Sequence, residues 1–527
     1  MHDVVSRISG IFGRSSGPDS HPRLTLLAWL VAAAALAHAG YILVGWLNDP
    51  LLDQHPFRQT QTALSTYWIM QGGPILAYDT PIVGSPWAIP FEAAVYQCFV
   101  AVLALLGVPL DAAGRIVSFA FLLAAAWPLR MLWRDLNLPP VGYPMACALL
   151  LASPLYLFWG RTFMIESCAW FFALLWLAFF VRFLQSGRVA PALVAILAGC
   201  LAILAKATTF PGFALVGGLI GLWYGWQWLR EAGLVRLMRR VALAGAAMFL
   251  PFVVGLAWVS FSDAAKSENP FGRLLTSAAL GGWNYGTMAQ RFSAPLWQTA
   301  VAGRMLPDIF GVLGAMTLVL LLGAVFRPRG LLAVGICLLG FLVPILVFTN
   351  LHIVHNYYQY ANGAFLLVAL AIALGSLPRM RFGSVVAGAL LVVVVGSQAA
   401  QFRRQNVPWM SLGSYGNGPQ QIGLMARANT PEDGSLLIFG EDWSSTVAYY
   451  SRRRSFALPY WTPPQLLAEV LQDPQSHLTG TRLSGIVDCM LPGPRYSALQ
   501  AEVDAFVAGR RVIGQAGHCR LLSMERD

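Results

Sequence analysis

An acid, a histidine, an arginine and several glutamines stand close together directly after the first hydrophobic segment of this chain. The cluster runs from Asp53 to Thr62 with the sequence DQHPFRQTQT. In a chain that is 57% hydrophobic and only 11% charged, such a cluster is costly unless it lies where a membrane helix meets water. A carboxylate there can accept a proton, and the planar fork of an arginine can bind a phosphate. The cluster therefore predicts chemistry on a lipid-linked phosphate at a bilayer surface.

Within this cluster we assign the proton-accepting role to Asp53, which would take the proton of an acceptor hydroxyl as the hydroxyl attacks the anomeric carbon of a sugar. An isolated aspartate at a helix end is usually just solvated, but Arg58, Gln59 and Gln61 follow within two helical turns and argue for a site. Arg58 would pair with a phosphate oxygen. His55 could be a surface residue, a phosphate donor or an alternative base, and we favour a supporting role for it in binding the substrate. Gln59 is a further candidate for substrate binding.

Further candidate residues flank other apolar runs. Glu92 opens one run and could bind the acceptor, although an acid in the first turn of a helix also suits the helix dipole. Arg161 and Glu166 bracket a very short turn between two runs, where ionisable residues are functional candidates. They could form a local ion pair, or Glu166 could orient Asp53 or the acceptor.

Lys206 interrupts two apolar runs in the segment LAKATTFPG. It is either a snorkelling lysine or a phosphate clamp, with the hydroxyls of Thr208 and Thr209 as further donors. His355 opens the segment HNYYQ before another run. Tyr357 and Tyr358 could be ordinary interfacial tyrosines, but the histidine and asparagine beside them favour a headgroup site.

The elements that must position these residues are membrane helices. The mean hydropathy is +0.61, and apolar runs of about 17–20 residues, long enough to cross about 30 Å of hydrocarbon, recur along the chain. The first run is too long for a cleavable signal peptide. We predict twelve candidate spans, near 24–46, 91–107, 115–132, 142–158, 165–184, 189–205, 211–228, 241–260, 308–326, 330–348, 359–377 and 383–400.

The formal charge of +11 reflects topology and argues against nucleic-acid binding, because the basic residues are split among short loops. These loops hold Arg230, Arg236, Arg239 and Arg240; Arg327 and Arg329; and Arg379 and Arg381, and the N-terminus carries Arg7, Arg14 and Arg23. If these segments are cytoplasmic, the outer turns place Asp53, Glu166, Lys206 and His355 on the same extracytoplasmic face. Arg403 and Arg404 are exceptions to this charge pattern.

The order of the segments poses a parity problem. Three apolar segments lie between Asp53 and Glu166, but an even number is needed to return to the same side. Either 91–107 does not cross the membrane fully or one segment boundary is misread; Arg130 and Arg134 favour an inside loop after the second of these segments and thus the first explanation. Within the outer loop 47–90, Thr60 to Met70 is expected to form an interfacial helix.

The composition changes near the C-terminus, and we divide the chain into a membrane domain, 1–400, and a small extracytoplasmic α/β domain, 401–527. Strands are predicted at 435–440 and 484–488 and helices at 444–453 and 496–508, with edge strands at 512–513 and 521–522. Cys489 and Cys519 lie in this domain, and the sequence leaves open whether they form a disulfide.

No spacing of Cys and His residues predicts a metal site. The first motif offers one acid, Asp53, and the second offers Glu166, which is a thin ligand set for Mg²⁺ or Mn²⁺. We therefore expect no cofactor, with a divalent metal only if the donor carries a pyrophosphate.

Taken together, the motifs resemble those of the GT-C polytopic membrane glycosyltransferases, such as the protein O-mannosyltransferases and the lipid A aminoarabinose transferase. The resemblance covers about residues 25–400 and rests on Asp53 with Arg58, the stretch Arg161 to Glu166, the element Leu204 to Lys206, and the stretch His355 to Gln359. It implies a GT-C fold with about 11–13 transmembrane helices, polyprenyl-phosphate sugar donors, and Asp53 as the base. The family usually has Asp-Glu at the first motif, whereas this chain has Asp53 and Gln54.

The expected function is transfer of a sugar from a polyprenyl-phosphate donor to a hydroxyl of a cell-envelope glycan, lipid or protein, with inversion at the anomeric carbon. The resemblance implies a bacterial inner membrane, with the site on its periplasmic face. Acceptor specificity is expected in the outer loops 47–90 and 260–307; in the second of these, Trp283, Tyr285 and Trp297 could stack on a sugar or anchor at the interface.

Other functions remain open from the sequence. Within enzymes, an oligosaccharyltransferase or a phospholipid-headgroup transferase would use the same face. Outside them, the alternatives are a transporter or flippase of lipid-linked sugars and a non-catalytic envelope-assembly protein. Transporters often show two related halves and charges at the middle of the membrane. This chain shows neither.

Overall fold

The computed structural model describes residues 21–231, 233–491, 493 and 496–526; Arg7 and Arg14, which contributed to the predicted topology, lie outside them. The chain forms two compact parts. The helical part comprises the described residues of Met1–Gly45, Arg115–Ala257 and Gly281–Pro408, and the mixed part those of Trp46–Gly114, Trp258–Leu280 and Trp409–Asp527.

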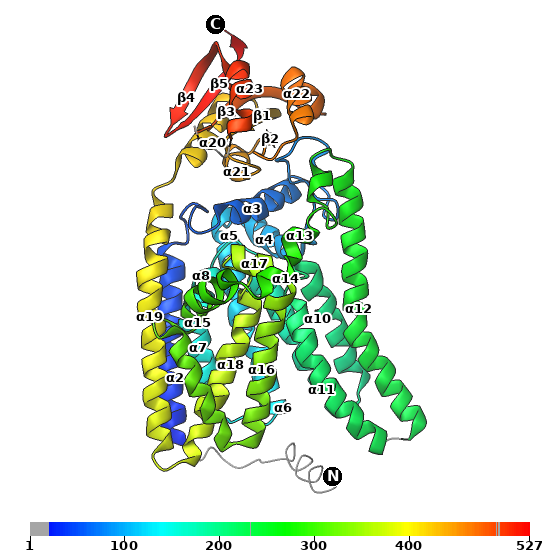
Figure 1. The fold of residues 1–527 in the computed structure, drawn as a ribbon, viewed down its shortest axis with the longest axis vertical. Coiled ribbons are helices and arrows are strands. Elements are labelled where there is room, and N and C mark those ends of the chain that lie inside the picture. The colour runs from blue at the N-terminus through cyan, green and yellow to red at the C-terminus, as the bar shows by residue number, and fades with distance from the viewer. Residues whose placement is uncertain (1–20, 232, 492, 494–495, 527) are drawn as a thin grey trace. The chain divides into compact units, whose positions relative to one another are not determined.

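Every apolar segment predicted from the sequence contains helix in the structure (Figure 1). The helices at these segments are α2 (Pro22–Gly45), α4 (Val95–Leu105), α5 (Leu110–Ala124), α6 (Ala126–Asp135), α7 (Gly142–Ala152), α8 (Pro154–Trp159), α9 (Glu166–Ser186), α10 (Val189–Ala205), α11 (Phe210–Glu231), α12 (Leu234–Ser267), α15 (Leu306–Phe310), η3 (Gly314–Phe326), α16 (Pro328–Val347), α18 (Tyr360–Ser376) and α19 (Gly383–Ser414).

Among the described residues, seven helical segments are long and apolar enough to cross a membrane, or eight if Pro295–Phe310 and Gly314–Phe326, bent by 69°, form one span. This makes the chain a multi-pass membrane protein. Fewer segments pass this test than the twelve predicted, in part because α4, α7 and α10 are shorter apolar helices. Helix α4 has 11 residues and rises only about 16 Å, which agrees with the expectation that 91–107 does not cross fully.

Trp176 fixes the helices that carry two of the candidate residues, Glu166 at the start of α9 and Lys206 directly after α10. Its ring is fully buried, and glycines of α10 and α11 let these helices approach it closely: a Cβ at Gly199 or Gly217 would lie 2.7 or 2.5 Å from the ring. The Trp176 indole N–H donates to the Ala247 carbonyl of α12 at 2.9 Å. One side chain therefore holds four helices in register.

The mixed part is built on a five-stranded sheet in the order β2-β1-β3-β5-β4. Its strands are β1 (Gly434–Phe439), β2 (Arg454–Ala457), β3 (Arg482–Asp488), β4 (Arg510–Ala516) and β5 (Cys519–Arg526). The first three are parallel, and β5 is antiparallel to both β3 and β4. The predicted strands and helices are present, but 521–522 is not an edge strand, because β5 lies between β3 and β4.

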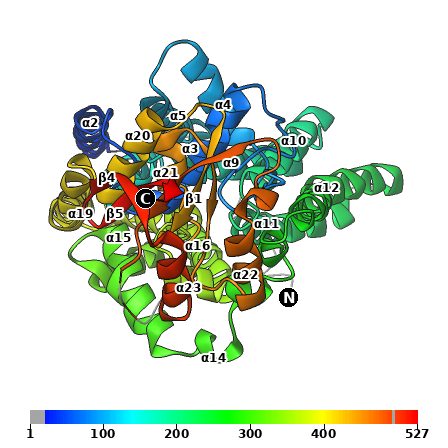
Figure 2. The ribbon, with the colours of Figure 1, turned by 90° about the horizontal axis from the view of Figure 1, so that it is seen from above.

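Helices cover both faces of this sheet (Figure 2). Strand β1 is buried on both sides, so its apolar residues alternate between two cores: Leu436 and Ile438 pack with Ile422 and Val447, whereas Leu437 packs in the other core. The covering helices are α20 (Gly418–Asn429) and α21 (Thr446–Ser451) on one face and α22 (Pro464–Gln472) and α23 (Ser497–Val507) on the other.

Segments of the predicted outer loops fold together with this sheet. The amide of Ser455 donates to the Pro81 carbonyl at 3.0 Å and that of Ala457 to the Ile82 carbonyl at 2.7 Å, so the loop pairs with the open edge of β2. Trp87 and Phe271 lie in the core on the α22–α23 side. The expected domain boundary at 401 falls inside α19, and the predicted loop 260–307 is divided between the two parts after Leu280.

Cys489 and Cys519 form a disulfide that joins the end of β3 to the start of β5, which answers the question that the sequence left open. The Glu441 carboxylate and a His518 ring nitrogen approach these sulfur atoms within 4.8 Å. Because the sulfurs are bonded to each other, they are not available as metal ligands in this structure.

Glu441 gives the mixed part a pH-dependent stability. Burial, aided by the neighbouring Asp442, raises the pKa of its carboxyl from 4.5 to about 7. The folded state binds the Glu441 proton more tightly than the unfolded state does. The resulting stabilisation is therefore greatest below the unfolded pKa of 4.5 and is lost as the pH rises through the folded pKa of about 7. We therefore expect Glu441→Gln to stabilise the mixed part at pH 8 by about 3 kcal/mol and to have little effect near pH 4.

Hydrogen exchange of the β1 amides in the full-length chain, corrected for the intrinsic rate at each pH, measures this effect. An equal fall in protection between pH 4 and pH 8 in the parent protein and in Glu441→Gln would contradict it.

Candidate active site

The first cluster lies in the mixed part, at the start of helix α3 (Pro56–Met70). His55 adopts a left-handed conformation with φ 52° and Pro56 occupies the first helical turn, so the chain bends sharply into the helix. This bend brings the Asp53 carboxylate to the Gln59 side chain, whose amide N–H donates to it. Asp53 is 6% exposed and Gln59 is fully buried. The candidate base is therefore held by a rigid amide rather than left as a solvated helix-end acid.

Helix α19 packs against the backbone of the loop that carries Asp53. Gly413 packs so closely that a Cβ at this position would lie 2.8 Å from the Asp53 backbone nitrogen and 3.0 Å from the Leu52 carbonyl carbon. Backbone atoms cannot yield as a flexible side chain does, so any side chain at 413 would displace the Asp53 loop.

Arg58 is the centre of a second set of contacts on α3. One guanidinium nitrogen donates to the Gln61 side-chain oxygen at 2.5 Å and another pairs with the Glu92 carboxylate at 3.0 Å. The Tyr78 hydroxyl donates to the Glu92 carbonyl at 2.8 Å and fixes that residue. Arg58 and Glu92 keep 19% and 23% of their side-chain surface exposed. The guanidinium thus remains accessible to a ligand from solvent.

The second cluster lies in the helical part. The Lys206 ammonium contacts a Glu166 carboxylate oxygen at 2.5 Å, and both side chains are almost completely buried. The other Glu166 oxygen has no hydrogen-bond partner among the described residues. A buried ion pair is costly unless its remaining hydrogen-bonding capacity is satisfied. A hydrogen-bond donor of a bound ligand would therefore be stabilised at this oxygen.

Aromatic rings complete this cluster. The Lys206 ammonium lies 4.1 Å from the centre of the Tyr358 ring and 4.9 Å from that of Tyr357, within the range of cation–π attraction. The His355 ring lies 5.2 and 5.7 Å from the same two rings, and the Trp283 ring is 6.0 Å from His355. The segments around Lys206 and His355, predicted separately, are therefore one cluster.

Arg161 contributes differently from the prediction. Its side chain is 1% exposed, with the guanidinium 5.0 Å from the centre of the Phe158 ring, whereas the ion pair of Glu166 is with Lys206. The other two aromatic residues of the predicted loop contact neighbouring protein groups. Tyr285 stacks on Phe348, and the Trp297 indole donates to the Arg291 carbonyl at 2.7 Å.

The arrangement of helices can be compared with solved structures, whereas the sequence matches no protein-family model and no curated protein. ArnT from Cupriavidus metallidurans bound to undecaprenyl phosphate is similar with a TM-score of 0.58 and 14% identity, over 94% of this chain and 97% of that one. The oligosaccharyltransferase AglB from Archaeoglobus fulgidus, in complex with an inhibitory peptide and a dolichol-phosphate, gives a TM-score of 0.54 and 11% identity over 88% and 69%.

A third similar structure is the arabinofuranosyltransferase AftD from Mycobacteria, with a TM-score of 0.52 and 15% identity over 94% of this chain and 40% of that one. The chain has the GT-C glycosyltransferase fold. The resemblance inferred from the motifs is thereby confirmed at the level of the fold.

Two residues of this GT-C chain that the sequence reading missed hold the second cluster in place. Arg304 donates to the carbonyls of Ile353, at 3.0 Å, and His352. The buried Asp308 carboxylate accepts hydrogen bonds from Gln359 at 2.9 Å and Gln405 at 3.1 Å. Both therefore fix the segment that carries Tyr357 and Tyr358. Asp308 had a sequence signal, since it is a charge inside a predicted apolar span, whereas Arg304 had none.

The helical part of the GT-C fold also contains an apolar cavity of about 760 Å³. Its lining includes Trp170, which lies four residues after Glu166 on α9, and Ala364, which lies four residues after Tyr360 on α18. Phe213, near the start of α11, also lines it. Other lining residues extend to Arg329 in the first turn of α16. The cavity thus starts about one helical turn from the second cluster and continues along the membrane helices.

Gly413 allows a test of the Asp53 loop that leaves every polar side chain in place. We expect Gly413→Ala to lower the transfer rate by about tenfold or more, because a misplacement of about 1 Å at a reacting group has effects of this size. The matched control is Gly396→Ala on the same helix, where an added Cβ meets nothing within 4 Å. The measurement is initial-rate transfer by both variants at equal membrane expression, and equal rates would contradict the role assigned to this contact.

Proposed function

We propose that this protein transfers a sugar from a polyprenyl-phosphate donor to a hydroxyl group on the extracytoplasmic side of a membrane. The observation that carries the proposal is the Lys206–Glu166 pair with its two tyrosine rings, placed about one helical turn from an apolar cavity. A cation at the head of a hydrocarbon-lined cavity matches a donor with a phosphate head and an isoprenoid tail. The similar structures of ArnT and AglB, which carry undecaprenyl phosphate and dolichol-phosphate, support this donor class.

The proposed reaction follows from the chemistry of the two clusters. Asp53 takes the proton of the acceptor hydroxyl while the hydroxyl oxygen attacks the anomeric carbon of the donor sugar. The bond between this carbon and the phosphate oxygen breaks, and polyprenyl phosphate leaves with the bonding electrons. Lys206 and the Tyr357 and Tyr358 hydroxyls stabilise the charge on the departing phosphate, and Arg58 adds a second cation. Attack from the side opposite the leaving group inverts the anomeric carbon.

Supporting roles fall to the remaining residues. Gln59 orients the Asp53 carboxylate, His55 shapes the bend that presents it, and Glu92 holds Arg58. In the helical part, Glu166 holds Lys206 in position and offers its second oxygen to the donor, while His355 packs against the tyrosine rings. Arg161 supports the second cluster through the packing of its buried guanidinium on Phe158.

The proposal places the protein in a bacterial inner membrane with both clusters and the C-terminal α/β region on the periplasmic side. The acceptor is a glycan, lipid or protein of the cell envelope. Of the outer segments that would bind it, 47–90 and 260–280 belong to the mixed part, where Ile82 pairs with Ala457 next to the C-terminal sheet, and 281–307 belong to the helical part.

We further propose transfer without a metal. The three candidate carboxylates already have partners: Asp53 accepts from Gln59, Glu92 pairs with Arg58, and Glu166 pairs with Lys206. Among the described residues, three or more potential metal-ligating side chains meet only at Glu441 and the disulfide. Each carboxylate is thus already neutralised or held by a side chain of the chain itself, and a divalent ion is expected only if the donor carries a pyrophosphate.

The direct test is transfer by the purified full-length protein from synthetic polyprenyl-phosphate sugars, after mass spectrometry has identified the lipids that co-purify with it. The proposal predicts that a polyprenyl phosphate co-purifies and that the sugar is transferred with inversion in the presence of EDTA. Movement of a lipid-linked sugar across vesicles without cleavage of its phosphate bond would instead support a flippase and overturn the proposal.

The apolar cavity allows a separate test of where the donor tail binds. Gly335 lines the cavity, and a Cβ there meets nothing within 4 Å. We expect Gly335→Phe to fill the cavity and raise the KM for a long-chain donor about tenfold, because each displaced CH₂ forfeits about 0.8 kcal/mol of apolar burial. A short-chain donor, which does not need the cavity, should be affected far less. Gly396→Phe is the control, and equal KM values for the long-chain donor in both variants would contradict this assignment.

A further inference from the structure

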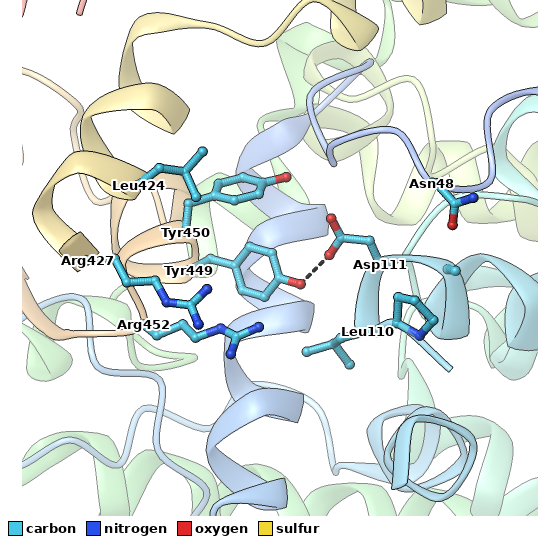
Figure 3. A pocket seen from close by; sticks show the side chains of 10 residues that line it. Asn48, Leu110, Asp111, Leu424, Arg427, Tyr449, Tyr450 and Arg452 are labelled. Atoms are coloured by element: carbon cyan, nitrogen blue, oxygen red, sulfur yellow. Dashed lines mark hydrogen bonds between the residues drawn. The ribbon is translucent and has the colours of Figure 1, made fainter. Parts of the chain in front are cut away.

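A separate cavity of about 360 Å³ lies within the mixed part. Figure 3 shows its side chains, which come from three stretches far apart in the chain: the loop around Asn48, the start of α5, and helices α20 and α21 with the residues after them. In contrast to the apolar cavity of the helical part, its lining mixes apolar residues with charged, polar and tyrosine side chains. It contains Asn48, Asp111, Arg427, Tyr449, Tyr450 and Arg452.

The charges of this cavity are unequal, with two guanidinium groups against one carboxylate. The Asp111 carboxylate accepts a hydrogen bond from the Tyr449 hydroxyl, as Figure 3 shows. Burial and the nearby Asp111 raise the pKa of the Tyr449 hydroxyl well above its usual value, so this hydroxyl stays protonated and continues to donate. Arg427 and Arg452 are exposed to solvent, and the cavity therefore carries a net positive charge.

A third arginine fixes the spacing of the other two. Arg453 is 4% exposed, and its guanidinium donates to the Arg427 carbonyl at 3.0 Å and the Thr430 carbonyl at 2.8 Å, both at the end of α20. It also donates to the Ser451 carbonyl at 3.3 Å, at the end of α21. The two helix ends that present Arg427 and Arg452 are thus tied together before any ligand binds, which lowers the entropy lost on binding.

The backbone at Arg452 adopts a positive φ, which residues other than glycine rarely do. This residue ends α21 in the left-handed region with φ 53°, a conformation that is strained for a residue other than glycine. Strained residues of this kind cluster at binding sites. Here the conformation places a long cationic side chain, rather than a glycine, at the cavity.

From these observations we infer that the cavity binds a sugar carrying an oxyanion, either a carboxylate or a phosphate, with the anion on Arg427 and Arg452 and the sugar hydroxyls on Asn48 and Asp111. Planar guanidinium forks match both oxyanions, whereas a neutral sugar offers the two arginines no opposite charge. The tyrosine rings offer apolar faces to the ring of the sugar.

The position of the cavity identifies this sugar as part of the acceptor, an assignment that rests on the proposed function. The Leu51 amide donates to the Tyr450 hydroxyl at 2.7 Å, so the cavity is joined to the loop that ends two residues later at Asp53. Asn48 belongs to the same loop. A saccharide anchored in the cavity is therefore bound by the segment that presents the proposed base.

The test measures binding to the full-length protein in nanodiscs of phosphatidylcholine by saturation-transfer NMR, with glucose, glucuronic acid and glucose 6-phosphate as probes. We expect one or both anionic sugars to bind at least tenfold more tightly than glucose, and the two anions separate a carboxylate site from a phosphate site. The variant Arg427→Gln/Arg452→Gln should lose this preference. The matched control Arg511→Gln, which removes an exposed arginine of β4, should retain it.

Equal binding of glucose and both anions, or unchanged anion binding in the double variant, would overturn the inference. Anion binding that disappears when the nanodiscs contain phosphatidylglycerol would also overturn it, because the site would then belong to lipid headgroups. Asp53→Asn should bind the probes as the parent protein does, since binding precedes proton transfer. Intact, arginine-dependent binding by a protein with no transferase activity would refute the proposed function but leave this site standing.

Discussion

Replacing Asp53 with Asn is expected to lower the transfer rate by about 10²–10⁴-fold, the usual contribution of a positioned general base. The amide has nearly the shape of the carboxylate but cannot take the acceptor proton. Expression should be unchanged, and so should donor binding, because the proposed donor contacts lie on other side chains. The loss should therefore appear in kcat, with little change in the KM for the donor. Initial rates of transfer over a range of donor concentrations measure both.

A second acid in the same loop provides the control for Asp53. Asp49 lies four residues earlier and accepts a hydrogen bond from Ser414, so Asp49→Asn makes the same change of charge next to the site. We expect this variant to lose no more than about threefold in rate, within the range of surface substitutions. If Asp53→Asn were as active as Asp49→Asn, Asp53 would not be the base.

The second large effect is expected at the Lys206–Glu166 pair, where stability and activity can be separated. Removing one partner of a buried ion pair leaves the other charge uncompensated, at a cost of about 3–5 kcal/mol. Both Lys206→Met and Glu166→Met should therefore destabilise the protein, as measured by its resistance to unfolding in mixed micelles containing SDS. Replacing both residues with methionine removes both charges and should restore most of the stability.

Activity should not follow stability in this series. The double methionine variant lacks the ammonium that we propose to stabilise the leaving phosphate, so we expect its transfer rate to stay about 10²–10³-fold below that of the parent protein, the usual effect of losing one such group. Recovery of both stability and transfer in the double variant would show that the pair has a purely structural role.

The sequence was sufficient to find the polar clusters because each stands out against an apolar background. Asp53 with Arg58, Lys206, and the tyrosines after His355 were all visible as costly groups at the ends of hydrophobic runs. The same reasoning located the apolar helices, because an apolar run depends only on local sequence, but among the described residues fewer of them than predicted are long enough to cross a membrane. The sidedness of the charged loops also singled out 91–107 as a segment that does not cross fully, and the 11 residues of α4 are consistent with this prediction.

Long-range pairings could not be predicted in this way. Glu166 and Lys206 are 40 residues apart. No local sequence pattern shows that they form an ion pair with each other rather than acting separately. The pairing of the Ile82 loop with β2 joins segments more distant still, and it explains why the division of the chain at residue 401 follows composition rather than the fold. Arg304 was missed for a related reason, because its partners are backbone carbonyls, which have no sequence signature.

We propose that the base at Asp53 and the cation at Lys206 serve one reaction on one side of the membrane. Labelling of single cysteines in sealed vesicles with a membrane-impermeant maleimide tests it, using Asn48→Cys and Ala207→Cys, two exposed positions near these residues, and the exposed Arg381→Cys as the reporter of the opposite side. The background would lack the five free cysteines. We predict that positions 48 and 207 are labelled from the same side and 381 from the other. Labelling of 48 and 207 from opposite sides would contradict the claim.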